Sequence, residues 1–357
     1  MMACSFPEFG RRRFTLAVLG TALVVLVGGS AFAGTPSAEL GKQGSNTTEA
    51  LKADPPTFPL KGSLTLDNSL GMGTFSEGAG ELSRPYFNML LSVKAHYRVP
   101  IELKLTVGLR FDVDINLIEN VDSSNTQPNQ LQVGDLRLWT QFKDILKHAP
   151  AGLSLSGGVE LFLPTSLMSQ YATKWLGIRT NLSLTWSKLS WLEFTYGLSA
   201  TKNFNGYTTN AVDWDDFDTP RISRPGGAEN IAEGLTATGA GIVEWGVSNS
   251  LSGTVTFLKD FSVSLEFALV NTFTYDTGAA DAYTSSYARA GRAQRDITYG
   301  SLDFSWNALK HLSVSVGSVV AQEPKTSDNT GFRFPFWDMT NGASNRQILY
   351  LSLKGAM

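Results

Sequence analysis

The sequence is almost free of cysteine and poor in histidine. Cys4 is the single cysteine among 357 residues, and it lies at the extreme N-terminus. The rest of the chain therefore offers no thiol for a disulfide or a cysteine metal site, and no cysteine follows the N-terminal apolar run where a lipoprotein would need one. A net charge of −3 and a pI near 5.7 also argue against a nucleic-acid partner, because such a partner favours a basic face.

Long apolar runs are missing beyond the N-terminus, which excludes membrane helices there. The N-terminal run from Phe14 to Val27 follows Arg11 to Arg13 and precedes Ala31-Phe32-Ala33. Basic residues, an apolar stretch and small residues in this order predict a cleaved export signal, residues 1–33. The alternative, an anchoring helix, is disfavoured because the run is short and interrupted by glycine.

The segment from Ile101 to Leu117 alternates strictly. Its odd positions are apolar, and its even positions read Glu, Lys, Thr, Gly, Arg, Asp, Asp and Asn. Because side chains alternate across a strand, one face of this segment must meet an apolar medium and the other a polar one. The segment is also longer than strands of soluble sheets usually are. It is typical of one strand of a transmembrane barrel.

About twelve segments alternate in this way. We expect strands near 62–74, 84–98, 100–117, 131–143, 152–163, 175–187, 191–204, 238–257, 261–275, 293–307, 311–322 and 345–355. Every second connection is short and the others are long and polar, which matches the short periplasmic turns and long outer loops of bacterial barrels. The sequence thus predicts an all-β, antiparallel transmembrane barrel of the outer-membrane type over residues 61–357. Residues 34–60 are predicted to form a flexible periplasmic tail, with an inward-folded plug as the alternative.

Aromatic residues gather beside the short turns. They are Tyr97, Trp186 with Trp191, Phe257 with Phe261, and Trp306. Amphipathic rings prefer the boundary between headgroups and acyl chains, so these residues predict a periplasmic girdle. The alternative is cross-strand aromatic packing in a secreted, soluble β-sandwich.

Extending each alternation assigns a set of charged side chains to the lumen. The lumen candidates are Lys94, Glu102, Lys104, Arg110, Asp112, Asp114, Asp135, Arg137, Glu160, Arg179, Glu193, Glu244, Glu266 and Asp303, with Asp67, Lys143 and Lys202 beside them. Acids and bases are balanced, so salt bridges are expected to hold the wall. The same charges can line a polar pathway, and twelve strands favour a narrow passage over a wide pore.

Two predicted outer loops have unusual composition. Phe332, Phe334, Phe336 and Trp337 are too apolar to leave in water, so we expect a ligand-capture loop, or else packing beneath other loops. Asp213, Asp215, Asp216 and Asp218 are weak candidates for a Ca²⁺ or Mg²⁺ site, against a simple solvated acidic loop. Arg289, Arg292 and Arg295 are candidates for lipopolysaccharide phosphates, or they serve solubility only.

Catalysis is not expected. His148 and His311 fall in predicted periplasmic turns, and His96 lies near the periplasmic end of its strand, so none is placed for an outer-leaflet triad. Asp112 and Asp114 are the remaining carboxylate pair, and pairing with Arg110 is the simpler interpretation.

One stretch resembles a known family. Val133-Gly134-Asp135-Leu136-Arg137-Leu138, with Gly157 to Thr165 ending in Leu163-Pro164-Thr165, resembles two strands of outer-membrane transporters associated with meta-pathway phenol degradation. The chain departs from that pattern at Ser166, where the family has glycine. The resemblance covers about 35 residues and implies passage of small, often aromatic or apolar compounds; it supplies no catalytic residue.

The sequence therefore predicts an outer-membrane channel or passive transporter for small molecules, without cofactor or metal. Its expected surroundings are outer-membrane lipid and lipopolysaccharide of a Gram-negative bacterium, with the oligomeric state open. The alternative is a non-conducting structural or surface-binding barrel whose lumen is closed by salt bridges.

Overall fold

The computed structural model describes most of the predicted barrel. The described residues are 60–71, 87–99, 104–118, 130–166, 169, 172–206, 208–213, 235–258, 260–278, 290–325, 332 and 347–356. The predicted signal lies outside these ranges, as does the predicted tail apart from its last residue, Leu60, which begins the first strand; both stay predictions. No helix of the described residues is long and apolar enough to cross a membrane.

Strands account for nearly all of the described residues. They are β1 (Leu60–Gly71), β2 (Phe87–Arg98), β3 (Leu105–Ile118), β4 (Gln130–Val133), β5 (Leu136–His148), β6 (Leu153–Leu163), β7 (Lys174–Leu189), β8 (Leu192–Asn205), β9 (Thr209–Asp213), β10 (Leu235–Gly241), β11 (Val243–Phe257), β12 (Phe261–Thr274), β13 (Gln294–Leu309), β14 (Leu312–Gln322) and β15 (Gln347–Ala356). Most are longer than strands of soluble sheets, as a tilted crossing of a bilayer requires.

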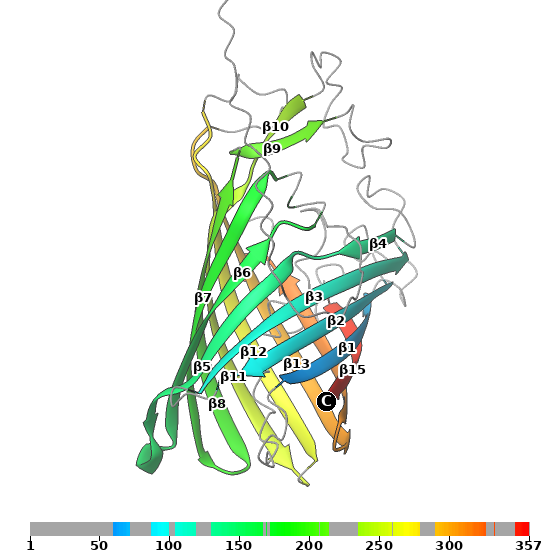
Figure 1. Cartoon of the computed structure of the whole chain (residues 1–357), viewed down its shortest axis with the longest axis vertical. Coiled ribbons are helices and arrows are strands. Elements are labelled where there is room, and N and C mark those ends of the chain that lie inside the picture. The colour runs from blue at the N-terminus through cyan, green and yellow to red at the C-terminus, as the bar shows by residue number, and fades with distance from the viewer. Residues whose placement is uncertain are drawn as a thin grey trace, which may run out of the picture.

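The sheet closes on itself. Each strand pairs antiparallel with its neighbour from β1 round to β15, β15 pairs with β1, and the pairing of β2 with β3 completes the circle. Twelve strands form the wall, because β4 continues the line of β5 and the β9–β10 pair forms a separate two-stranded sheet. This confirms the predicted antiparallel barrel (Figure 1).

Two predicted strands have wrong bounds. The strand predicted over 238–257 is divided at Ile242 into the end of β10, which belongs to the separate sheet, and β11. The strand predicted over 131–143 is interrupted at Gly134 and Asp135, where the Gly134 amide still donates to the Asp112 carbonyl across the break, 2.8 Å away. The same strand then runs on to His148, past an irregularity between Phe142 and Leu146, so His148 ends a strand and does not lie in the turn. A bulge or break adds a residue to one strand, so a prediction that assumes a strict period of two places the end of the strand wrongly.

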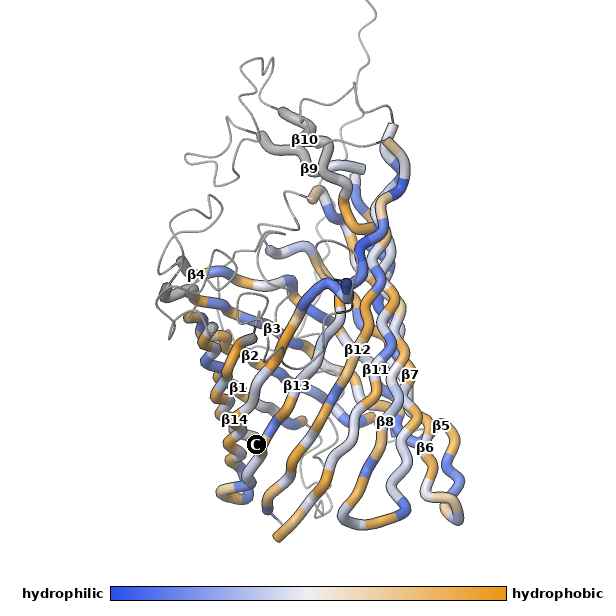
Figure 2. Tube along the Cα trace, turned by 180° about the vertical axis from the view of Figure 1, so that it is seen from behind, coloured by the Kyte–Doolittle hydropathy of each residue, from blue (hydrophilic) through white to orange (hydrophobic). Residues whose placement is uncertain are grey.

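The outer face of the barrel is apolar. Large hydrophobic side chains along the strands are strongly exposed, for example Leu251 at 56%, Val316 at 55% and Phe304 at 53%. Their neighbours in sequence are small or charged, which produces the alternating colours along the strands in Figure 2. In a soluble sandwich this greasy face would have to be covered, whereas in a bilayer it meets lipid.

Aromatic rings line the short-turn end of this outer face. Phe261 stacks against both Phe257 and Trp306, with ring centroids 6.0 and 5.9 Å apart. Trp186 stacks on Phe194 at 5.8 Å, a partner that the sequence did not indicate. This end corresponds to the periplasmic side in bacterial barrels, which keep their turns short there.

Candidate functional site: the charged lumen

The strand number bounds the lumen. Neighbouring strands lie about 4.8 Å apart and tilt by about 40° in such barrels, so twelve strands enclose a circumference of roughly 75 Å and a backbone radius of roughly 12 Å. Long side chains from opposite walls then leave only a narrow space between them.

A ladder of guanidinium and carboxylate groups crosses the inner face of β3, β5, β6 and β7. The Arg110 Nε donates to Asp112 Oδ1 at 2.8 Å, and the Arg137 Nη2 lies 3.2 Å from Asp112 Oδ2. Glu160 continues the ladder, with the Arg137 Nη1 at 3.8 Å and the Arg179 Nη1 at 3.1 Å. Register explains the order, because Arg110 pairs with Arg137 and Glu160 pairs with Arg179 across the strands.

Phe162 lies inside this ladder. Its ring sits beneath three cations, with Arg179 at 4.7 Å, Arg137 at 5.2 Å and Lys174 at 5.8 Å from the centroid. A phenyl ring with only 8% exposure on the inner wall fixes the guanidinium planes by cation–π attraction. The ladder is therefore oriented by packing as well as by charge.

The facing wall carries an acidic group. The Tyr350 hydroxyl donates to Asp303 Oδ2, and Asp67 and Glu266 lie within electrostatic range of the same hydroxyl. Tyr350 fits because Gly317 opposes it on β14, where an added Cβ would lie 2.4 Å from the tyrosine ring. Asp67 and Glu266 are 5% and 4% exposed, so these carboxylates belong to the interior.

The two groups occupy different parts of the wall. In the order around the barrel, the ladder spans β3 to β7, whereas Glu266, Asp303 and Tyr350 lie on β12, β13 and β15, three strands away at the nearest approach on either side. Lys94 extends the basic side, since it pairs with Arg110 on the inner face. Charged side chains of both signs therefore line the lumen, and fixed charges of this kind act on ions that pass close to them.

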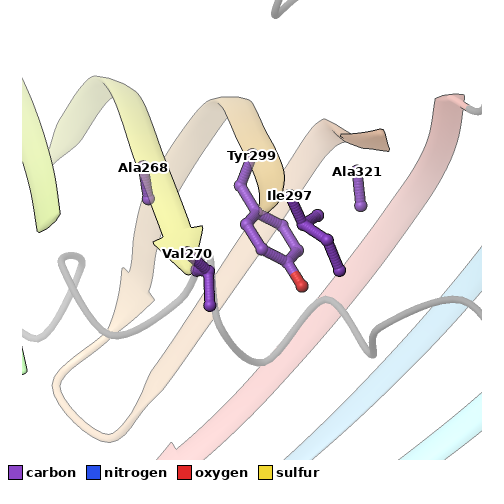
Figure 3. Packing of buried hydrophobic residues seen from close by; sticks show 5 residues of the cluster. All are labelled: Ala268, Val270, Ile297, Tyr299 and Ala321. Atoms are coloured by element: carbon purple, nitrogen blue, oxygen red, sulfur yellow. The ribbon is translucent and has the colours of Figure 1, made fainter. Parts of the chain in front are cut away.

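An apolar patch adjoins the acidic group. Ala268, Val270, Ile297, Tyr299 and Ala321 project from β12, β13 and β14 and contact one another (Figure 3). Tyr299 is 1% exposed, and its hydroxyl has no hydrogen-bond partner among the described residues. The wall thus carries a buried apolar patch beside the charged groups, and composition alone did not indicate the patch.

Asp135 joins three segments at the outer rim. It accepts hydrogen bonds from the Ser166 amide at 3.1 Å and from the Ser169 hydroxyl at 2.6 Å, and Lys174 Nζ lies 3.1 Å away. Burial raises the pKa of Asp135, but Lys174 and the two serine donors outweigh this effect and hold the pKa below its usual value. The carboxylate therefore acts as an ionised anchor for the segment that follows β6.

The two sequence pieces that carry the family resemblance meet at this anchor. Thr165 Oγ1 accepts a hydrogen bond from the Leu136 amide at 2.8 Å and donates to the Gly134 carbonyl at 3.1 Å. The two pieces lie about 30 residues apart in sequence and yet form one junction across β5 and β6. Ser166, which departs from the family pattern, uses its backbone amide here, so the departure leaves this contact intact.

Two lumen assignments, Lys202 and Glu244, were wrong. Lys202 pairs with Ile178 and Trp245, and the same row of β8 continues through the exposed Leu198. An irregularity between Val243 and Trp245 shifts the alternation of β11. The Glu244 side chain therefore lies on the outer face, where it forms a salt bridge with Lys202. A one-residue change of register exchanges the two faces of a strand.

The other lumen candidates fall into three groups. Inward positions on strands hold Asp67, Lys94, Arg110, Asp112, Asp114, Arg137, Glu160, Arg179, Glu193, Glu266 and Asp303. Lys104 and Lys143 lie at the short-turn end, where Lys104 precedes β3 and binds Asp144, and Lys143 lies in the irregular part of β5. Glu102 lies outside the described residues. Their role in a pathway stays a prediction.

The predicted carboxylate pair on β3 is occupied by structural contacts. Asp112 bridges Arg110 and Arg137, and Asp114 accepts a hydrogen bond from the Asn88 side-chain amide. These contacts match the interpretation that both aspartates serve the wall.

The predicted loops are described only in part. Phe332 is 81% exposed and forms an isolated bridge with Lys325, whereas Phe334, Phe336 and Trp337 lie outside the described residues. Asp213 ends β9, and the other three aspartates of the acidic loop also lie outside. Among the residues that the structure describes, no group of three or more acidic, histidine or cysteine side chains is placed to hold a metal ion.

Closure, an apolar exterior and a charged interior together decide the class. The chain is a β-barrel of the outer-membrane type. Its inner face holds the charged side chains, and its apolar outer face contacts the membrane.

Several solved structures have a similar fold at low sequence identity. The chain is similar to an outer-membrane channel from Pseudomonas putida F1, with a TM-score of 0.49, 10% identity, and coverage of 86% of this chain and 100% of that one. It is also similar to the KdgM porin, with a TM-score of 0.38, 9% identity, and coverage of 82% and 98%. The outer-membrane channel DcaP of Acinetobacter baumannii is similar with a TM-score of 0.36, 12% identity, and coverage of 84% of this chain and 96% of that one. No family model matches the sequence, and no curated protein does.

Proposed function

We propose that this protein is a passive outer-membrane channel for small molecules. The observation that carries the proposal is a closed barrel whose inner face is lined with charged side chains, with Arg110, Arg137 and Arg179 interleaved with carboxylates on one part of the wall and the acidic group around Tyr350 on another. Fixed charges on the wall of a narrow passage select among ions and orient polar solutes.

The resemblance at Gly134 to Leu136 and Leu163 to Thr165 supports small aromatic or apolar compounds as substrates. One feature fits them: the exposed Phe332 near the long-loop end. A molecule with an apolar body and one polar group would contact Phe332 at the entrance and the charged belt inside. Entry at the outer loops and diffusion past the belt require no cofactor and no covalent step.

The competing function is a closed barrel whose charges only brace the wall. Burial favours it, because the side chains of Asp112, Arg137 and Glu160 are 5%, 12% and 12% exposed. A planar bilayer separates the two functions. Discrete current steps from the mature chain support the channel, whereas a folded, inserted and silent barrel supports the closed form.

Ion selectivity tests whether the charges of the wall lie along the pathway. Asp67→Asn and Glu266→Gln should shift current toward anions, and neutral replacements on the basic wall should shift it toward cations, because each removes one fixed charge near the path. Uptake of a small aromatic acid into loaded liposomes, compared with its neutral methyl ester, then tests the substrate class.

A further inference from the structure

A charged cluster lies on the outside of the barrel, where the long-loop end meets the apolar wall. Lys202 belongs to the outward row of β8, together with Leu198 and Tyr196, which are 39% and 47% exposed. It is ten residues from the short-turn end of β8. A tilted strand needs about 9 to 11 residues to cross the bilayer, so Lys202 is at the level of the outer headgroups.

Aromatic rings surround this lysine. Its Nζ lies 4.7 Å from the ring centroid of Trp245, 5.2 Å from Tyr275 and 5.6 Å from Phe204. Trp175, at the corresponding end of β7, is 72% exposed. These rings form an outer aromatic girdle, opposite the girdle at the short turns, and such girdles mark the membrane boundary.

One carboxylate holds two cations in this cluster. Glu244 binds Lys202 through Oε1 and the Arg292 Nη2 through Oε2, the latter at 2.6 Å. Two cations against one carboxylate leave an excess positive charge, and the Arg292 side chain is 46% exposed. A guanidinium has five N–H donors, so Arg292 keeps donors for a partner outside the protein.

We propose that this outer cation site, formed by Lys202, Arg292 and Glu244 on the rings of Phe204, Trp245 and Tyr275, binds a phosphate of an outer-leaflet lipid of the lipopolysaccharide type. Guanidinium groups bind phosphate with paired hydrogen bonds, and cations near a membrane surface attract anionic lipid. The rings supply the apolar contact beside the phosphate. The site faces lipid and not the lumen, so the inference is independent of whether the barrel conducts.

The site can be tested with purified full-length mature protein in detergent micelles. The probe is diphosphorylated lipid A, and native mass spectrometry measures the fraction of barrels that carry lipid as its concentration rises. Lipid A without phosphates, phosphatidylethanolamine and inorganic phosphate serve as comparison ligands. Heat-modified gel migration establishes that each variant is folded.

We expect Lys202→Met with Arg292→Ala to bind diphosphorylated lipid A about tenfold more weakly, which corresponds to about 1.4 kcal/mol. Arg292→Ala alone should lose part of this affinity. Because Arg292 lies outside the strands, this substitution should leave the barrel folded. Glu244→Gln should bind more tightly, because it leaves both cations uncompensated. Lys188→Met, at the short-turn end of β7, is the matched control and should bind as the parent does.

Several outcomes would overturn the site. They are unchanged binding in the folded double variant, weaker binding in Glu244→Gln, or equal binding of lipid A with and without phosphates. Competition by inorganic phosphate at the same concentration would indicate a free-anion site in place of a lipid site.

Discussion

Replacing Arg137 with methionine should make the channel more selective for cations. Arg137 lies in the middle of the basic ladder, between Asp112 and Glu160. With the wall roughly 12 Å from the axis and an arginine reaching roughly half that distance, its charge acts about 6 Å from a passing ion. At a dielectric constant of 80 the interaction is about 0.7 kcal/mol.

Salt sets the size of the effect. Screening at 0.1 M salt, where the Debye length is about 10 Å, reduces the interaction to about 0.4 kcal/mol. Cations gain this amount and anions lose it, so the permeability ratio changes by about 0.8 kcal/mol, or roughly three- to fourfold. At 1 M salt the Debye length is about 3 Å and the change should fall below about twofold.

The assay is the reversal potential of bilayer currents under a potassium chloride gradient, recorded at low and high salt. Lys147→Met is the matched control, since its side chain is 60% exposed at the short-turn end and should leave selectivity unchanged. Arg137→Met should also cost roughly 3 kcal/mol of unfolding free energy, because two buried carboxylates lose a partner. Lost stability with an unchanged reversal potential would refute the pathway argument and leave Arg137 a purely structural role.

Three further predictions concern stability, measured by urea unfolding of the detergent-folded barrel. Tyr299→Phe should leave stability equal or raise it by about 1 kcal/mol, because a buried hydroxyl without a partner is costly; a clear loss would contradict this. Asp135→Asn should remove stability at pH 7 and lose less on acidification than the parent. Folding lowers this pKa, so the contribution is complete above the unfolded value of about 3.9 and disappears as pH falls through the folded one; an identical pH profile would refute the anchor. Gly108→Ala should cost about 1 to 3 kcal/mol, because its Cβ would lie 2.6 Å from the Trp139 ring, whereas Gly246→Ala, with 3.9 Å to its nearest contact, should be tolerated.

Strict alternation is the part of this molecule that the sequence predicts best. The segment from Ile101 to Leu117 indicates β3 and its two faces, because a period of two translates directly into a lipid side and a lumen side. Each of the twelve wall strands has a predicted counterpart for the same reason. The start of β3, at Leu105, lies later than alternation suggests.

Irregular ladders are where the prediction fails. The bulge beside Trp245 moves Glu244 to the outer face, and no residue type in the local sequence announces the shift. Lys202 was assigned to the lumen by extending the alternation of its strand, although the row it shares with Leu198 and Tyr196 places it outside. Counting every second residue along β8 from Tyr196 gives the outward position of Lys202.

The site is only partly visible in the sequence. Charges on the inner face were identifiable, but Tyr350 and Phe162 were not, because their roles depend on partners from distant strands. The grouping of charges on the wall depends on the order of the strands around a closed circle. Alternation within single strands contains no such information.

Single-channel recording of the mature chain in a planar bilayer, together with the variants Arg137→Met and Asp67→Asn, tests most directly whether this barrel is a channel lined by its wall charges. We expect discrete conductance steps, with selectivity shifted toward cations in the first variant and toward anions in the second. Protein that inserts, resists heat in detergent and passes no current would contradict it, as would a current whose selectivity ignores both charges.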